Sequence, residues 1–162
     1  MLPKGFKINR SARKTSGKIE EFFPHLSKLP AIKKIFSQKK SREKIFAKTL
    51  VRMTSKNCHY MRIVRGKLLI NPKHLKNSDK GTIYLDILHE LVHVRQWMQG
   101  KNLYDERYNY FERPTEIEAY KFCIREAKKI GMKKYEIIHY LEVEWAEREE
   151  FERMLRKFRL TN

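Results

Sequence analysis

Five residues near the middle of the chain, His89 to His93, have the types and spacing of a metal site; they read His-Glu-Leu-Val-His. On an α-helix, residues i and i+4 lie on the same face, so the two imidazoles can bind one metal ion. Glu90 lies about 100° further round the helix than His89, where a carboxylate can reach a metal-bound water without binding the metal. The motif therefore predicts a Zn²⁺ site with His89 and His93 as ligands and Glu90 as general base.

The residues on either side of this motif predict a long buried helix. Ser78 and Asp79 are suitable N-cap residues, Gly81 lies close to the expected start, and Gly100 is suited to end the helix. Apolar residues on most sides indicate that this helix is buried, and two His and one Glu on a buried helix need polar partners, which a bound metal ion would supply. The apolar residues are Ile83, Leu85, Ile87, Leu88, Leu91, Val92 and Val94.

A catalytic zinc ion usually has three protein ligands, so a third ligand is expected further along the chain. Pro114 suits the first turn of a second helix, which Gly131 would end. Glu116 and Glu118 lie about 200° apart on that helix, so only one of them can face the zinc ion. Glu116 shares its face with Tyr120 and is the preferred ligand, with Glu118 as the alternative.

Together, His89-Glu-Leu-Val-His93 and Glu116-Ile-Glu-Ala-Tyr120 resemble the motifs of gluzincin zinc peptidases, and most of all those of the small minigluzincins and related phage and archaeal peptidases. In gluzincins the third ligand is a Glu on the next helix, followed four residues later by a polar residue that supports a ligand His. That offset implies Glu116 as ligand and puts Tyr120, in place of the usual Asp or Asn, in the supporting position. The resemblance covers about residues 60 to 130.

The resemblance implies a zinc-dependent endopeptidase that acts on protein or peptide substrates, in an active or a latent form. Glu90 would take a proton from the zinc-bound water and return it to the leaving amine. The oxyanion stabiliser is left open among Tyr104, Tyr108, Tyr110 and Arg113 in the connection between the two ligand helices, and His139 beyond it.

Residues 60–72 predict a strand, a tight turn at Arg65-Gly66-Lys67, and a second strand that ends at Asn71-Pro72. By the resemblance, Leu68 to Ile70 would be the edge that binds the substrate backbone by strand addition. The alternative is an ordinary hairpin that covers one side of the core.

Composition favours a cytoplasmic protein of one domain with an appendage. The chain of 162 residues has no apolar stretch near the ~20 residues of a membrane span, and no apolar run follows its charged N-terminus. Two cysteines, Cys58 and Cys123, provide no disulfide framework.

Positive charge is concentrated ahead of the predicted zinc helix. Residues 1–80 contain 22 Lys and Arg against 4 Asp and Glu, whereas residues 81–162 contain 15 of each. We therefore divide the chain into a basic N-terminal extension, residues 1–50, and a zinc peptidase domain, residues 51–162. The extension is compatible with a solvated basic subdomain, a contact with nucleic acid or another polyanion, or a latency segment.

The expected fold class is α+β: a small zincin-like unit with a short hairpin, the active-site helix and the glutamate helix, preceded by the basic extension. Apolar positions in residues 18–50 predict two short helices broken by Pro24 and Pro30. Lys133 to Phe158 predicts one long helix with an acidic face, which could dock on the basic half of the same chain or of a partner in a homodimer.

Two classes of function fit these features. The first is the zinc endopeptidase, and the alternative is a basic nucleic-acid- or partner-binding protein with a structural or degenerate zinc site. Glu90 favours the first, because a structural site has no use for a general base and usually closes with a fourth Cys or His ligand.

Overall fold

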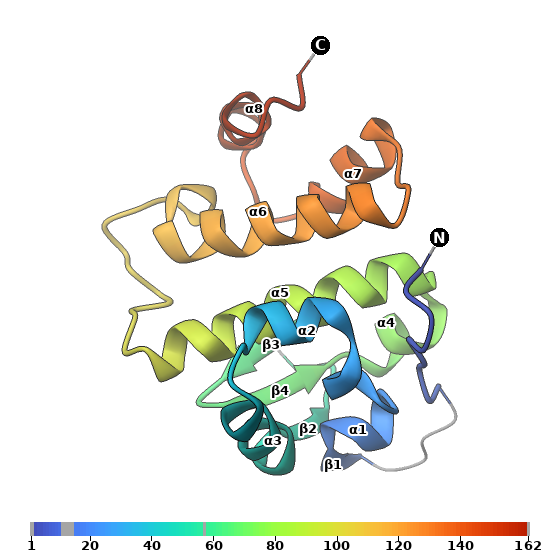
Figure 1. Ribbon diagram of the computed structural model, residues 1–162. Helices are drawn as coiled ribbons and strands as arrows, with labels where there is room; N and C mark the ends of the chain where they lie inside the picture. Colours follow the sequence, from blue (N-terminus) through green and yellow to red (C-terminus); the bar gives the residue numbers. More distant parts are fainter. Residues whose placement is uncertain (1, 11–14, 57, 162) are drawn as a thin grey trace.

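A four-stranded mixed sheet packed on a long buried helix forms the centre of the structure, a computed structural model that describes residues 2–10, 15–56 and 58–161 (Figure 1). The strand order is β1-β2-β4-β3; β2 and β4 run parallel, and the other neighbours run antiparallel. The strands are β1 (Ser16–Lys18), β2 (Leu50–Met53), β3 (Met61–Val64) and β4 (Lys67–Ile70). The described residues also form eight α-helices, so the α+β class is confirmed.

The predicted hairpin is β3 and β4, joined by Arg65 and Gly66. Both turn residues have positive φ, 47° and 75°, as a two-residue turn requires when it matches the right-handed twist of its strands. Because β2 pairs with the other side of β4, the predicted substrate edge at Leu68 to Ile70 is wrong. The edge strands are β1 and β3, and β3 is the edge formed by the predicted hairpin; the sequence reading missed this because it did not include β2.

Helix α5 (Lys80–Met98) carries the His-Glu-Leu-Val-His motif, as predicted. Asp79 caps it by accepting hydrogen bonds from the backbone N–H of Gly81 and Thr82 at 2.7 and 2.9 Å. At the other end Gly100 has a φ of 74°, which a residue without a side chain adopts most easily. The apolar residues expected to be buried on α5 are buried.

A short helix that the sequence reading did not predict, α4 (Pro72–Asn77), is tied to α5 through His74. Its Nε2 lies 2.6 Å from Oδ2 of Asp86, and its Nδ1 lies 2.8 Å from the hydroxyl of Ser78. This network fixes the entry of the chain into α5.

Helix α6 (Pro114–Lys129) begins at Pro114, as predicted, and packs against α5 (Figure 1). A 3-10 turn, η2 (Tyr110–Glu112), precedes it. Cys123 is fully buried on this helix and, like Cys58, is a free thiol. The two predicted ligand helices therefore lie side by side.

The N-terminal residues contain more structure than two helices: β1, α1 (Ile19–Phe22), the 3-10 turn η1 (Leu26–Lys28), α2 (Pro30–Ile35) and α3 (Lys39–Lys48). Pro30 starts α2, because its missing N–H would have no helical partner in the first turn. Phe22 and Ile32 are fully buried in one hydrophobic core with α5, and α2 packs on α5. The extension proposed for residues 1–50, of which 1 and 11–14 lie outside the described residues, therefore contributes to the common core.

The predicted long C-terminal helix is wrong: the chain forms α7 (Lys134–Leu141), a connection, and α8 (Arg148–Lys157). Trp145 in the connection packs on the ring of Tyr60, with 5.7 Å between ring centroids, and the buried Glu150 of α8 accepts a hydrogen bond from Phe111 N–H at 2.7 Å. These tertiary contacts outweigh the local preference for a continuous helix. Figure 1 places α8 and α3 at opposite ends of the molecule, so the acidic stretch does not dock on α3 within one chain.

Within the described residues, each helix is either too short or too polar to cross a membrane.

Candidate metal centre

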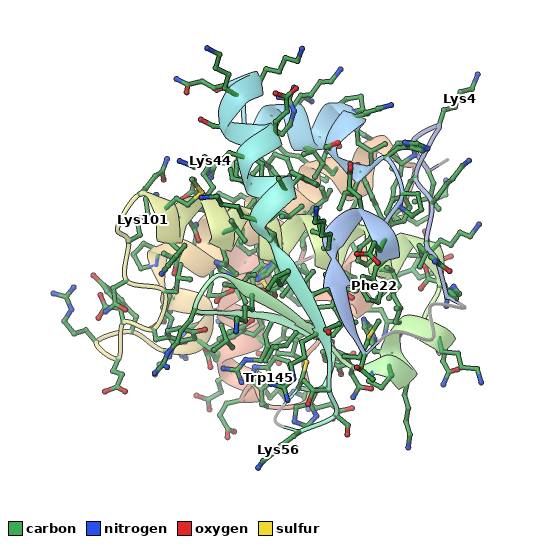
Figure 2. All side chains as sticks on the ribbon, turned by 90° about the horizontal axis from the view of Figure 1, so that it is seen from below. Lys4, Phe22, Lys44, Lys56, Lys101 and Trp145 are labelled. Atoms are coloured by element: carbon green, nitrogen blue, oxygen red, sulfur yellow. The ribbon has the colours of Figure 1, made fainter. Side chains whose placement is uncertain are left out.

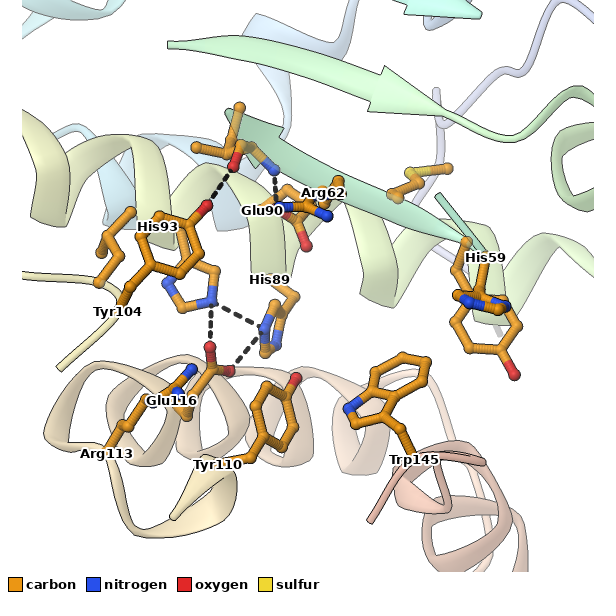
Figure 3. Close-up of a pocket in the computed structure, with 14 residues that line it drawn as sticks. His59, Arg62, His89, Glu90, His93, Tyr104, Tyr110, Arg113, Glu116 and Trp145 are labelled. Atoms are coloured by element: carbon orange, nitrogen blue, oxygen red, sulfur yellow. Dashed lines mark hydrogen bonds and ion pairs between the residues drawn. The ribbon is translucent and has the colours of Figure 1, made fainter. Parts of the chain in front are cut away.

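His89, His93 and Glu116 converge in the structure (Figure 3). Nε2 of His89 lies 3.1 Å from one Glu116 oxygen, and Nε2 of His93 lies 3.3 Å from the other. The two Nε2 atoms are 2.9 Å apart. Because all three side chains are buried and their ligand atoms lie within 4.8 Å of one another, the group can hold a metal ion.

Glu118, the alternative ligand, lies outside this group. Its Oε2 accepts hydrogen bonds from Lys101 Nζ at 2.8 Å and from Gln96 Nε2 at 2.9 Å, and it also pairs with Arg95. The structure therefore places Glu116, and not Glu118, beside the two histidines.

Gln96, which the sequence reading missed, fixes a proton on Nδ1 of His93. Its Nε2 donates to the carbonyl of Thr115 at 2.9 Å and to the carboxylate of Glu118, which are both acceptors, so its Oε1 must face His93. Oε1 lies 2.7 Å from Nδ1 of His93, which therefore carries a proton and donates. Nε2 of the neutral ring is then left with its lone pair directed at the site, as a metal ligand requires. The position of Gln96, three residues after His93 on the same helix, was the signal in the sequence that could have identified this hydrogen bond.

The charges of the three ligand groups are coupled. Burial lowers the pKa of His93, but the carboxylate of Glu116 outweighs burial and raises that pKa to about 9. Burial also disfavours the charge on Glu116, yet His93 and His89 hold the pKa of Glu116 well below its usual range. Glu116 therefore stays a carboxylate and His93 holds a proton beside it, at the position where a metal cation could bind instead.

The donor set fits a zinc ion. Two imidazole nitrogens and one carboxylate oxygen are the ligands of many catalytic zinc sites, and the group opens into a cavity rather than closing with a fourth ligand. Oε2 of Glu116 is buried, and among the described residues it accepts no well-aligned hydrogen bond, although His89 is close. A bound cation would satisfy this oxygen.

Glu90 lies beside this group on α5 and contacts the edge strand. Its Oε2 accepts a hydrogen bond from the backbone N–H of Ile63 at 2.7 Å. Burial raises the pKa of Glu90, against the opposing effect of His93 and His89. A buried carboxylate with a raised pKa, next to a metal site in a cavity, is suited to take and return a proton.

The cavity at the metal centre has a volume of about 330 Å³ and lies between β3 and α6. Tyr104 crosses it and donates a hydrogen bond to the carbonyl of Ile63 at 2.8 Å (Figure 3). Of the five residues considered as oxyanion stabilisers, Tyr104, Tyr110 and Arg113 line this cavity.

A second cavity, of about 350 Å³, adjoins the first, and His139, another residue considered as an oxyanion stabiliser, lines it. Trp145 lines both cavities, and its ring lies 5.9 Å from that of His59 and 6.0 Å from that of Tyr110, so that it bridges the two sides of the cleft. The break between α7 and α8, which the sequence reading missed, makes this position available to Trp145.

Tyr120, in the position that usually supports a ligand histidine, contacts His89 through its ring, with centroids 4.6 Å apart. Its hydroxyl is hydrogen-bonded to that of Tyr110 at 3.0 Å. Tyr120 therefore packs on His89, and the ring nitrogen of His93 that faces away from the site donates its hydrogen bond to Gln96.

Comparison with known proteins found no matching family model, no matching curated protein and no matching solved structure. The resemblance to gluzincin peptidases therefore stays a prediction from the two motifs.

Proposed function

We propose that this chain is a zinc-dependent endopeptidase that hydrolyses peptide bonds with Glu90 as general base. The observation that carries the proposal is the convergence of His89, His93 and Glu116 in one cavity that also contains Glu90 and the edge strand β3. A structural zinc site usually has four protein ligands and no cavity, and three ligands beside an acid–base group favour catalysis.

The exposed backbone of β3 supports a peptide substrate. Glu90 and Tyr104 reach the N–H and the C=O of Ile63, so both groups point into the cavity. Because backbone groups two residues apart on a strand point the same way, those of Met61 also face the cleft. An extended peptide would pair with β3 at Met61 and Ile63. At Ile63 it would displace the hydroxyl of Tyr104 from the C=O and the carboxylate of Glu90 from the N–H, which frees Glu90 to act as a base.

The chemistry follows from the neighbours of the site. A zinc ion held by His89, His93 and Glu116 would lower the pKa of a coordinated water and polarise the scissile carbonyl. Glu90 then accepts the proton of the attacking water and returns it to the leaving amine. Gln96 keeps His93 in the tautomer that binds metal. Tyr104, Tyr110 and Arg113 line the cavity and are the groups available to stabilise an oxyanion.

The test compares wild-type protein with Glu90→Gln and with Glu118→Gln as a matched control. Bound zinc is measured by atomic emission, and cleavage of an unfolded, fluorescently quenched casein is followed with and without a chelator. We expect about one zinc ion per chain in all three proteins and cleavage by wild type and Glu118→Gln only, because loss of a general base costs about 10²–10⁴-fold in rate.

Two results would contradict the proposal. Equal cleavage by Glu90→Gln would mean that another group or a contaminant does the chemistry. Bound zinc with no cleavage by the wild type would instead support the structural-site alternative, in which the basic half of the chain carries the function.

A further inference from the structure

The structure has a third cavity, separate from the one lined by His89 and His93, which we call the α3 groove. It has a volume of about 450 Å³ and lies between α3, the β3–β4 turn and the C-terminal end of α5. Its lining includes Lys44 and Lys48 of α3, Arg65 and Lys67 at the turn, and Trp97 and Met98 of α5.

The groove exposes large apolar side chains. Trp97 and Met98 are 51% and 53% exposed, and Leu50 beside them is 47% exposed. Trp97 lies against the turn, because a Cβ added at Gly66 would be 3.3 Å from its ring. The turn thus supports the indole, which presents an aromatic surface to solvent.

The same groove is strongly basic. Lys44, Lys48, Arg65 and Lys67 line it, and none of the described lining residues is Asp or Glu. In the described part of the chain, the side chains of these four residues make no ion pair or hydrogen bond. Figure 2 shows Lys44 among many nitrogen-tipped side chains along α3. The groove therefore has charge without an internal counterion.

We propose that the α3 groove binds single-stranded nucleic acid, with Trp97 stacking on a base and the four cations contacting phosphates. An aromatic surface next to unpaired cations is the combination that sequence-tolerant binding of single strands uses. The apolar residues line a concave surface, whereas a membrane-binding patch has to project into the lipid. This activity does not depend on the proposed peptidase chemistry, since none of the six residues is a proposed ligand or acid–base group.

The groove also has a fixed relation to the metal centre. Trp97 follows His93 by one turn of α5, and Arg65 follows the edge strand β3 directly. A nucleic-acid strand held in the groove would therefore lie at the end of the cleft where Tyr104 crosses to Ile63. A protein bound to the same strand would be brought close to the metal centre.

The experiment measures fluorescence anisotropy of a short fluorescein-labelled oligothymidylate with the full chain, at several salt concentrations. Four phosphate contacts predict a slope of log K against log salt of about −3. Lys44→Gln/Lys48→Gln should reduce the slope to about −1.5 and weaken binding about 25-fold at 0.1 M salt. The control Lys121→Gln/Lys128→Gln removes the same charge from exposed positions of α6 and should bind like wild type.

Stacking is tested separately. Trp97→Ala should weaken binding by about five- to 150-fold at unchanged salt slope, and Trp97→Phe should recover most of the loss. Circular dichroism establishes that each variant is folded, and Glu90→Gln should bind the oligonucleotide like wild type whether or not the chain is a peptidase.

Three outcomes would overturn the proposal. The first is no binding by the wild type near 0.1 M salt, and the second is equal binding by the groove and α6 variants. The third is displacement of the oligonucleotide by polyglutamate or by phosphatidylglycerol vesicles at matched charge concentration, which would identify an acidic protein segment or an anionic membrane as the partner.

Discussion

Replacing Gln96 with leucine would remove the hydrogen bond that fixes the tautomer of His93. Gln96 is fully buried and makes three hydrogen bonds: to His93, to the Thr115 carbonyl and to Glu118. Leucine has a similar volume, so the change leaves the Nδ1–H of His93 and the Thr115 carbonyl buried without their partner. Each such group costs about 1–3 kcal/mol, so the free energy of unfolding of the metal-free protein should fall by about 2–6 kcal/mol.

The effect on zinc should be separable from the effect on stability. Loss of the hydrogen bond behind a ligand histidine lowers metal affinity about 10- to 100-fold. Gln96→Glu keeps an acceptor for His93 but loses both donated hydrogen bonds, so it should lower stability and largely retain zinc affinity. Gln99→Leu, at the exposed position directly after α5, is the matched control and should change neither quantity.

Zinc affinity is measured by competition with a chromogenic chelator, and stability by urea unfolding in EDTA. If Gln96→Leu binds zinc within about twofold of the wild type, Gln96 does not set the state of His93 and the reasoning on its tautomer is refuted.

Three further predictions follow from the structure. Asp79→Ala should lower the free energy of unfolding by about 1 kcal/mol and Asp79→Asn by less, because Asp79 accepts both hydrogen bonds from the first turn of α5. Burial raises the pKa of Asp79, but the hydrogen bonds from Thr82 and Gly81 outweigh burial and lower it, so the stabilisation by Asp79 is lost as pH falls through its folded pKa. Equal pH profiles of stability for wild type and Asp79→Ala would contradict this. Zinc binding at pH 7.5 should release a proton, because the pKa of about 9 keeps the metal-free His93 site protonated there; calorimetric enthalpies that do not vary with the ionisation enthalpy of the buffer would disprove it. Phe22→Ala should lower the free energy of global unfolding by about 3–5 kcal/mol, because this residue lies in the core shared with α5. An unchanged free energy of unfolding would instead indicate an independent N-terminal unit.

The two ligand helices could be predicted because their signals are local. Asp79 and Pro114 mark the starts of α5 and α6, and the apolar spacing on each helix identifies its buried side. Helix geometry excluded Glu116 and Glu118 as joint ligands, since residues two apart face different directions, and the preference for Glu116 came from its shared face with Tyr120 and from the resemblance.

The features that could not be predicted depend on contacts between distant segments. Strand β2 decides which strand is the edge, because it pairs with β4, but it has no adjacent turn signal of the kind that Arg65-Gly66-Lys67 provides for β3 and β4. Nothing local ends α7 at Leu141; the packing of Trp145 on Tyr60 and of Glu150 on η2 does so. The α3 groove combines three segments that lie far apart in the sequence.

The position of the ligands on consecutive helices has a consequence for the mechanical integrity of the molecule. His93 and Glu116 flank the connection between α5 and α6, so an ion bound by both would act as a cross-link that closes a loop of a little over 20 residues. By the loop-entropy estimate used for disulfides, such a closure restricts the unfolded chain by about 3 kcal/mol. Removal of the ion would therefore loosen this connection first, and with it the Tyr104 contact to Ile63, so chelation should expose residues 99–113 to proteases before the rest of the chain unfolds.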